Sequence, residues 1–194
     1  MRIALFGTSG DPPTIGHRKI LEWLCDHYHL VVVWVSNNPF KTHQATLDQR
    51  LEMMALTIES ITPQPLNLEI HPEISHPHTL ETVKLARQIW QQATFDLVVG
   101  ADLVTQIPSW YHAAELLQQV NLLVIPRQGH QILTSDLERL TSLGTQVTIA
   151  DLEVPTTSSS GFRQKREVSH LIPALLEYIH RNRIYLWQEP NHPN

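Results

Sequence analysis

Residues 1–17 read MRIALFGTSGDPPTIGH and carry the clearest structural signal in the chain. The apolar residues 3–6 predict a buried parallel strand that stops at Gly7, and the small residues and prolines that follow predict a turn. An amphipathic segment starts at Gly16. A helix N-terminus offers unpaired N–H groups and a partial positive charge, which suit phosphate. Because Gly16 admits a ligand close to the backbone and His17 can donate to a phosphoryl oxygen, we expect a nucleotide site here.

The rest of the chain repeats this alternation of strand and helix. After a first helix over residues 16–28, we expect strands at 30–35, 66–70, 95–99, 122–125 and 147–152, and helices at 47–60, 80–92, 113–119, 134–144, 162–168 and 173–180. Pro108 is expected to break the helix that follows the 95–99 strand. Alternation on this scale predicts an α/β fold, a doubly wound parallel sheet with right-handed crossovers. We expect one domain over residues 1–194, with a small C-terminal helical part from about residue 157.

The composition is that of a globular chain. Of 194 residues, 42% are hydrophobic and 17% are charged, which suffices for one well-packed domain. The formal net charge of −5 argues against a general nucleic-acid binder, which needs Lys and Arg contacts. The single cysteine, Cys25, excludes an internal disulfide and fits a reducing compartment. No apolar run approaches the ~20 residues of a membrane helix, so we expect a cytoplasmic protein without nucleic-acid or membrane partners.

Polar residues follow several of the predicted strands. They fall in the segments 7–17, 37–41, 100–102 and 156–163. Since the carboxyl ends of parallel strands meet at one edge of the sheet, we expect these segments to share one crevice. In the last segment, hydroxyls at a helix start and Arg163 suit a polyphosphate, which takes both donors and charge. Taken alone, that segment also fits a serine-capped helix with a solvated arginine.

Three histidines, His71, His76 and His78, cluster in the loop before the 80–92 helix. No thiolate accompanies them, and histidine-bearing loops are common in a chain with twelve histidines. We therefore expect no metal site in this loop and leave its role open.

The segment 7–17 resembles the G-G-x-F-D-P-x-[HT]-x-G-H motif of the nucleotidylyltransferase superfamily, and residues 14–17 match its [HT]-x-G-H element. Gly10 stands where Phe is usual, and Thr14 stands where most members carry a first His, which removes one imidazole donor. Residues 158–163 resemble the S-S-[ST]-x-[IVF]-R motif that the superfamily places on the ATP phosphates. The resemblance implies a Rossmann-like nucleotidyltransferase fold.

The middle of the chain is similar to one branch of that superfamily, the bacterial nicotinate mononucleotide adenylyltransferases. Residues 98–102, 107–111 and 124–127 resemble their I-I-G-A-D, L-P-x-W and V-x-x-R-P-G run. Residues 38–41 and 50–53 resemble P-P-H-K and R-x-x-M, with Phe40 for the usual His. Residues 79–82 resemble Y-T-x-D-T, with His78 for Tyr. The resemblance covers nearly the whole chain.

This resemblance implies that ATP and nicotinate mononucleotide give nicotinate adenine dinucleotide and pyrophosphate. The phosphate of the mononucleotide attacks the α-phosphorus of ATP directly, so catalysis consists of holding two polyanions in line and stabilising charge on the leaving pyrophosphate. The implied catalytic residues are His17, Arg163, Lys41 and Thr14. The implied ATP-binding residues are Gly7, Thr8, Ser9, Gly16, His17, Gly100, Asp102, Ser159, Ser160 and Arg163.

The implied substrate-binding residues are Lys41, Thr79, Asp102 and Trp110. Trp110 would stack on the pyridine ring, Thr79 and neighbouring amides would hold the carboxylate, and Asp102 would accept from a ribose hydroxyl. Mg²⁺ is expected to bridge the ATP phosphates, held mainly by substrate and water, and no residue is assigned as a metal ligand. Asp11 has three open roles: orienting the loop, approaching the metal, or capping the turn.

Two alternatives remain open. One is a related adenylyltransferase that acts on nicotinamide mononucleotide or phosphopantetheine, because acid and amide substrates differ by one charged group that no spacing resolves. The other is a catalytically silent nucleotide-binding relative, suggested by Gly10, Thr14 and Phe40. A homodimer is compatible with the sequence.

Overall fold

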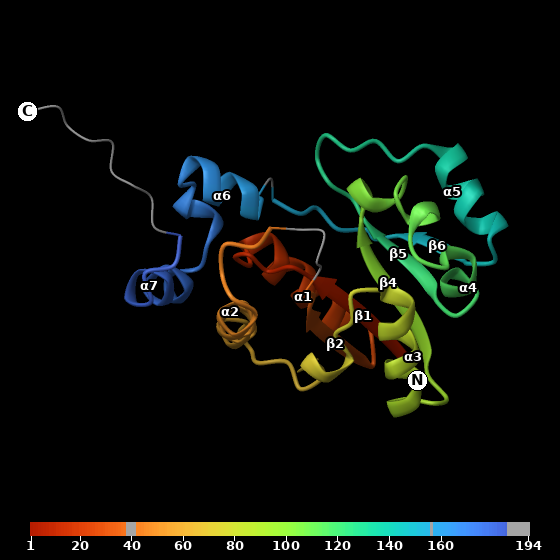
Figure 1. Cartoon of the computed structure of the whole chain (residues 1–194), viewed down its shortest axis with the longest axis horizontal. Helices are drawn as coiled ribbons and strands as arrows, with labels where there is room; N and C mark the ends of the chain where they lie inside the picture. Colours follow the sequence, from red (N-terminus) through yellow and green to blue (C-terminus); the bar gives the residue numbers. More distant parts are fainter. Residues whose placement is uncertain (38–41, 156, 186–194) are drawn as a thin grey trace, which may run out of the picture.

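A parallel sheet forms the centre of the computed structural model, which describes residues 1–37, 42–155 and 157–185 (Figure 1). Six strands of the described chain make up this sheet in the order β3-β2-β1-β4-β5-β6, and each neighbouring pair is parallel. They are β1 (Arg2–Thr8), β2 (Leu30–Val35), β3 (Leu68–Ile70), β4 (Thr94–Gly100), β5 (Asn121–Ile125) and β6 (Val147–Ile149). The predicted doubly wound α/β fold is confirmed.

Helices and short 3₁₀ turns connect the strands. The helices are α1 (Ile15–His27), α2 (Leu47–Glu59), α3 (Thr79–Ile89), α4 (Ala113–Leu117), α5 (Thr134–Ser142), α6 (Ser159–Lys165) and α7 (Pro173–Arg181). The 3₁₀ turns are η1 (Pro72–Ile74), η2 (Ala101–Leu103), η3 (Ile107–Ser109) and η4 (Val168–His170). Local chemistry sets several of the helix starts. Thr46, for example, accepts from the Gln49 N–H while the Gln49 side chain accepts from the Thr46 N–H.

Apolar residues on alternate strand positions build a core on each face of the sheet. Leu5, Val32 and Val99 face α3, α4 and α5, whereas Phe6 and Val33 face α1 and α2. All six residues of β2 are buried, as the continuous apolar run predicts for a strand covered on both sides.

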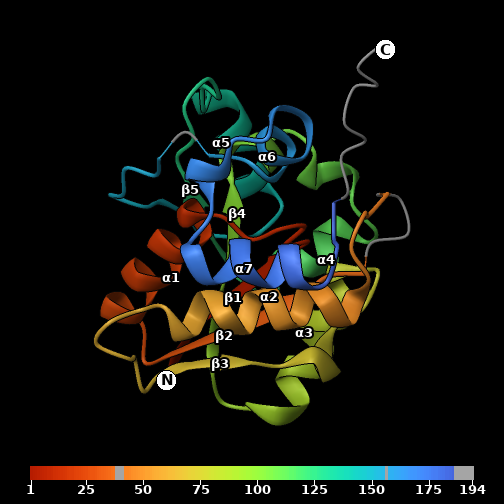
Figure 2. The same cartoon turned by 90° about the vertical axis from the view of Figure 1, so that its left-hand side faces the viewer.

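A third apolar cluster joins the C-terminal helices to the rest of the molecule. Phe162 of α6 and Leu175 and Ile179 of α7 pack with Met53 of α2. Figure 2 shows α7 lying along α2, at one end of the sheet. The segment that bears the predicted serine and arginine motif is thereby anchored beside the first helices of the chain.

Several boundaries differ from the sequence prediction. β1 continues past Gly7 to Thr8, and β3 begins only at Leu68, because Leu66 is fully exposed. The helix predicted at 162–168 begins at Ser159, where the Ser158 side chain accepts from the Gly161 N–H. It ends at Lys165, because the left-handed backbone of the next residue, Arg166 (φ 57°), stops the helix before η4.

The region after β4 also differs from the sequence prediction. Two 3₁₀ turns, η2 and η3, replace the broken helix expected around Pro108. Pro108 lies in the first turn of η3, where its missing N–H costs nothing.

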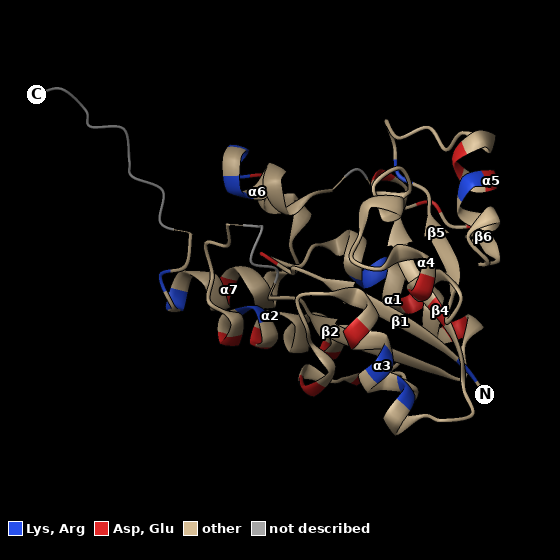
Figure 3. Ribbon diagram, turned by 45° about the vertical axis from the view of Figure 1, so that its right-hand side comes forward, with Lys and Arg blue, Asp and Glu red and all other residues tan. Residues whose placement is uncertain are grey.

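The strand order determines where the crevice of the candidate site lies in the sheet. The chain leaves β1 toward β2 on one side, while β4 lies on the other, so the loops after β1 and β4 diverge and open a crevice between them. On the outer helices, acidic and basic residues are interspersed (Figure 3), in line with the net charge of −5. Within the described ranges, no helix is long and apolar enough to cross a membrane.

Candidate active site

A pocket of about 990 Å³ lies at the carboxyl ends of β1 and β4. Segments from all parts of the sheet edge line it, as the convergence of polar loops predicts. The predicted site residues on its wall are Gly7, Thr8, Ser9, Thr14, Gly16, His17, Thr79, Gly100, Asp102, Trp110, Ser159, Ser160 and Arg163. Lys41 and Phe40 lie outside the described residues.

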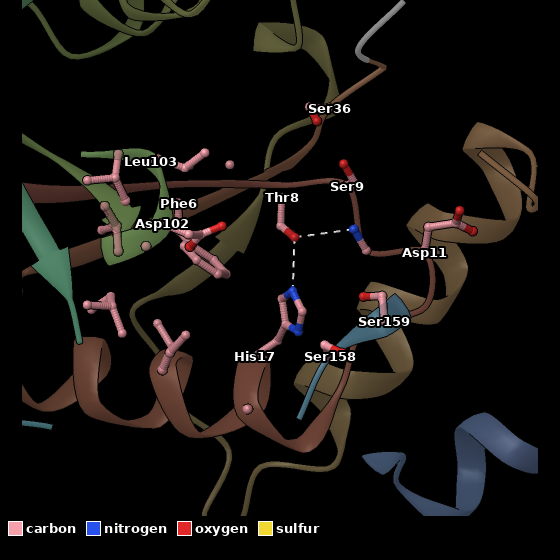
Figure 4. A pocket seen from close by; sticks show the side chains of 18 of the residues that line it. Phe6, Thr8, Ser9, Asp11, His17, Ser36, Asp102, Leu103, Ser158 and Ser159 are labelled. Carbon is pink, nitrogen blue, oxygen red and sulfur yellow. Dashed lines mark hydrogen bonds between the residues drawn. The ribbon is translucent and has the colours of Figure 1, made fainter. Parts of the chain in front are cut away.

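His17, in the first turn of α1, is oriented by hydrogen bonds at both ring nitrogens. The Thr14 N–H donates to Nδ1 across 3.1 Å, so Nδ1 is the acceptor and Nε2 carries the hydrogen. Nε2 lies 3.0 Å from Oγ1 of Thr8, which also accepts from the Gly10 N–H. Figure 4 shows Thr8 and His17 facing one another, with Ser158 and Ser159 to one side and Asp102 to the other. The Nε2–H donor is therefore directed at the Thr8 hydroxyl, which lines the pocket with it.

His17 is neutral at physiological pH. Burial lowers its pKa to about 4, and the charge of Arg127 contributes to the same shift. A neutral ring still donates from Nε2, and it does so without the desolvation cost of an imidazolium.

Two glycines shape the loop around His17. Gly10 adopts a left-handed backbone (φ 54°), which a phenylalanine at this position would strain, so the departure from the family motif has a local reason. A Cβ on Gly16 would come within 2.7 Å of Oγ1 of Thr157 and 3.2 Å of Cγ1 of Val154. Gly16 therefore has a packing role besides the one expected in ligand approach, since Val154 and Thr157 lie against α1 there.

Arg50 braces two loops of the crevice. Its side chain is 1% exposed, and Nη1 donates to the carbonyl oxygens of Ser9 and Ser36, each at 2.8 Å. Ser9 follows β1 and Ser36 follows β2, so one guanidinium ties neighbouring strand ends together. Sequence reasoning assigned no role to Arg50, although its place in the R-x-x-M segment was a usable signal.

Asp11 is held by backbone and side-chain donors. Its carboxylate is buried and accepts from the N–H groups of Gln44 and Ala45, at 3.0 and 3.1 Å, and from the Tyr185 hydroxyl. This bonding favours the loop-orienting role among the three open roles. It does not fit the metal-approaching one, because the carboxylate oxygens already have donors.

The serine and arginine motif contacts the first loop. Ser159 Oγ donates to the carbonyl oxygen of Pro12 at 2.8 Å, and Arg163 Nη1 donates to the carbonyl oxygen of Asp11. Thr157 Oγ1 donates to Oγ1 of Thr14 at 3.2 Å. Thr157 and Thr14 are 143 residues apart in the sequence. The two motifs that resemble phosphate-binding elements thus form one wall of the pocket.

Asp102 and Arg127 form an ion pair on the opposite wall, with Oδ2 and Nη1 3.4 Å apart. Asp102 follows β4 and Arg127 follows β5. Sequence reasoning selected Asp102 but gave Arg127 no role. Its place directly after a predicted strand was the available signal.

The end of the pocket near α3 is aromatic. Thr79 is the first residue of α3, and the preceding His78 makes no side-chain cap bond. The His78 ring stacks on Tyr111, with centroids 4.2 Å apart, and Trp110 packs against the core on the same wall. His78 and Tyr111 line the pocket but were not predicted as site residues.

His71 lies outside the pocket lining and bridges two carboxylates. Nε2 lies 2.8 Å from Glu69 and Nδ1 lies 2.6 Å from Glu73. Burial opposes a charge on this ring, but the hydrogen bonds and charges of Glu73 and Glu69 outweigh it and raise the pKa of His71. Among the residues that the structure describes, no group of three or more His, Cys, Asp or Glu side chains could hold a metal ion.

A phosphate-suited helix start at the switch point of a doubly wound sheet is typical of a nucleotide-binding protein. The chain belongs to the cytidylyltransferase-like family, whose model matches residues 5–165. Its curated relatives include proteins named nicotinate-nucleotide adenylyltransferase. A probable enzyme of that name from Synechocystis sp. is 37% identical over 95% of this chain and 99% of its own length. The enzyme from Bacillus subtilis is 26% identical, over 95% and 98%.

Solved structures share the fold. Nicotinic acid mononucleotide adenylyltransferase of Plasmodium falciparum, complexed with NaAD, superposes with a TM-score of 0.80 at 18% identity and covers 95% of this chain and 97% of its own. The same enzyme complexed with APC gives a TM-score of 0.75 at 19% identity, over 95% and 96%. The family resemblance read from the sequence is confirmed.

Proposed function

We propose that this protein transfers the adenylyl group of ATP to nicotinate mononucleotide and releases nicotinate adenine dinucleotide and pyrophosphate. One observation carries the proposal: a single pocket joins an anion-suited wall at the start of α1 to an aromatic wall at the start of α3. Curated relatives named nicotinate-nucleotide adenylyltransferase also support it, since their matches cover 95% of this chain.

At the α1 wall, the proposed ligand is the ATP triphosphate. His17 Nε2 and the hydroxyls of Ser159 and Ser160 donate to phosphate oxygens, and Arg163 supplies positive charge. Thr14 acts through His17, because its N–H directs the ring. In the ligand-free protein Ser159 donates to the Pro12 carbonyl oxygen and Arg163 to that of Asp11. These donors turn to the phosphates when ATP binds, and they then stabilise the charge that builds on the pyrophosphate.

At the α3 wall, the proposed ligand is the nicotinate group. Its carboxylate meets the N-terminal N–H groups of α3 and the Thr79 hydroxyl, while Trp110 contacts the ring. The absence of a side-chain cap from His78 supports this placement. A carboxylate gains more from a helix N-terminus than an amide does, so the acid is the preferred substrate.

The reaction needs no covalent enzyme intermediate. A phosphate oxygen of the mononucleotide bonds to the α-phosphorus of ATP, and the bond from that phosphorus to the bridging oxygen breaks, so pyrophosphate leaves with the electron pair. The residues of the pocket hold the two phosphates in line.

Mg²⁺ enters the proposal only as the counter-ion that ATP brings. The donor set of the described side chains does not form a protein cage for it, since the Asp11 carboxylate is taken by its own donors and Asp102 pairs with Arg127.

The test is pyrophosphate release with ATP and Mg²⁺, in parallel with nicotinate mononucleotide, nicotinamide mononucleotide and phosphopantetheine. We expect turnover with the first to exceed the other two by at least about tenfold. Preference for the amide or for phosphopantetheine would reassign the substrate. Silence with all three, in protein that still binds ATP, would favour a catalytically silent relative.

A matched pair of variants tests the α3 wall. Thr79→Val should raise KM for nicotinate mononucleotide and leave KM for ATP within about twofold. Thr134→Val is the control, because Thr134 is also the first residue of its helix but does not line the pocket. Equal effects of the two substitutions would remove Thr79 from substrate binding.

A further inference from the structure

Tyr185, at the end of the described chain, reaches the first loop of the sheet. Its hydroxyl donates to Oδ1 of Asp11 across 2.6 Å, although 174 residues separate the two. Both side chains are buried, with 6% and 2% of their surface exposed. Nothing in the family motifs of the sequence pairs these residues.

The surroundings hold Tyr185 in this place. Its ring packs edge-on against Phe162 of α6, with centroids 5.6 Å apart, and the Ile184 N–H donates to the carbonyl oxygen of Ile179. The backbone of Tyr185 is left-handed (φ 55°), a conformation that a bulky residue keeps only where neighbouring contacts require it. The hydroxyl is therefore aimed at Asp11 by packing.

Asp11 joins four segments of the site. Oδ1 accepts from Tyr185 and the Ala45 N–H, and Oδ2 accepts from the Gln44 N–H. Arg163 donates to the Asp11 carbonyl oxygen, and its Nη1 lies 3.7 Å from Oδ2. The guanidinium that is proposed to bind phosphate thus lies beside a buried carboxylate in the absence of ATP.

A carboxylate this close to Arg163 competes with phosphate for it. Each donor that Asp11 accepts spreads its negative charge and weakens its attraction for the guanidinium. We propose that Tyr185 is a positioning residue for ATP: its hydrogen bond to Asp11 limits the hold of that carboxylate on Arg163, so that Arg163 exchanges Asp11 for an ATP phosphate. The inference rests on the proposed function through the role of Arg163.

The protonation of the tyrosine fits this role. Burial, followed by the hydrogen bond to Asp11 and its charge, raises the pKa of Tyr185 far above its usual value, so the hydroxyl remains a donor at every pH at which the protein works.

The experiment measures binding of α,β-methylene-ATP by calorimetry, because this analogue reports affinity independently of turnover. Tyr185→Phe should raise its Kd about tenfold and change the Kd of nicotinate mononucleotide by less than about twofold. Tyr178→Phe is the matched control, since Tyr178 lies on α7, is partly buried and packs against the same apolar cluster. It should leave both affinities unchanged.

A double-mutant cycle with Arg163→Ala separates positioning from loosening of the fold. If Tyr185 acts through Arg163, Tyr185→Phe adds less than about twofold to the loss of ATP affinity in the Arg163→Ala background. The proposal would be overturned if the effects of Tyr185→Phe and Arg163→Ala on the Kd of the analogue multiplied. It would also be overturned if Tyr185→Phe weakened binding of the analogue and of nicotinate mononucleotide equally. Asp11→Asn is the second variant: it removes the charge that competes for Arg163, so it should leave analogue binding unchanged or tighten it, and a loss like that of Tyr185→Phe would overturn the proposal. Failure of both variants to fold would assign the contact to stability alone and overturn the proposal. A wild type that binds the analogue but makes no product would contradict the proposed function and leave this test intact.

Discussion

Thr14 and His17, three residues apart at the start of α1, share two contacts: the Thr14 N–H donates to Nδ1 of His17 at 3.1 Å, and the Thr14 hydroxyl lies 2.9 Å from the same nitrogen. Thr14 occupies the position where most superfamily members carry a first histidine. The backbone donor is independent of the side chain at position 14, so the orientation of His17 survives this departure from the motif.

Loss of the His17 donor should affect turnover strongly. We expect His17→Ala to lower kcat by roughly 100-fold or more, the order of magnitude for removal of one preorganised donor to developing charge. Pyrophosphate release under saturating ATP is the measurement. His27→Ala is the control, because His27 ends the same helix and is exposed. Turnover at the wild-type level in the His17 variant would exclude His17 from the mechanism.

ATP binding should raise the pKa of His17. Burial, aided by Arg127, lowers this pKa to about 4 in the ligand-free protein, and phosphate charge next to Nε2 favours the protonated ring. Titration of the His17 ring by NMR, with and without α,β-methylene-ATP, measures the shift. A midpoint that does not move on binding would mean that the phosphates lie away from Nε2.

Removal of Arg50 should destabilise the fold at the crevice. Arg50→Met leaves the buried carbonyl oxygens of Ser9 and Ser36 without this donor, so we expect a loss of about 2 kcal/mol in the free energy of unfolding. Urea denaturation is the measurement. Arg139→Met, at an exposed position on α5, should change stability by less than about 0.5 kcal/mol. Equal effects of the two substitutions would contradict the bracing role.

The contact of His71 with Glu69 and Glu73 should give a pH-dependent contribution to stability. Because folding raises the pKa of His71, this contribution is fully present below its unfolded pKa of about 6.5 and is lost as the pH rises through the folded value. We expect His71→Gln to lower the urea midpoint most at about pH 5.5 and progressively less at higher pH. His180→Gln, exposed on α7, serves as control. A deficit that grows with pH would reverse the sign and refute this account.

Much of the fold was predictable from local pattern. The apolar run at 30–35 predicts a central strand, and β2 is buried throughout and lies between β1 and β3. The carboxyl-end rule predicts that the polar loops converge, and Thr8, Asp102 and Ser159 line one pocket. The fold class and the family are confirmed. The roles of individual site residues, including Lys41, remain predictions.

The sequence predictions were wrong or incomplete for the ends of some helices and strands and for contacts between residues far apart in the sequence. The start of α6 was misplaced because Ser158 competes as a cap, a local choice that apolar spacing does not report. The roles of Arg127, which follows β5, and Arg50, in the first turn of α2, were missed because an arginine in either place is usually solvated. Only tertiary contacts show that these two arginines have structural partners. Arg127 pairs with Asp102, and Arg50 donates to the carbonyl oxygens of Ser9 and Ser36.

The sequence by itself determined the alternation of strands and helices and the phosphate-suited start of α1, since apolar period, turn residues and helix caps act over a few residues. Tertiary structure alone decided that Tyr185 meets Asp11 and that Arg163 lies beside both. The reason is physical: the partner of a buried carboxylate is selected by how helices pack around it, and the apolar contacts of α6 and α7 with α2 hold both beside the first loop.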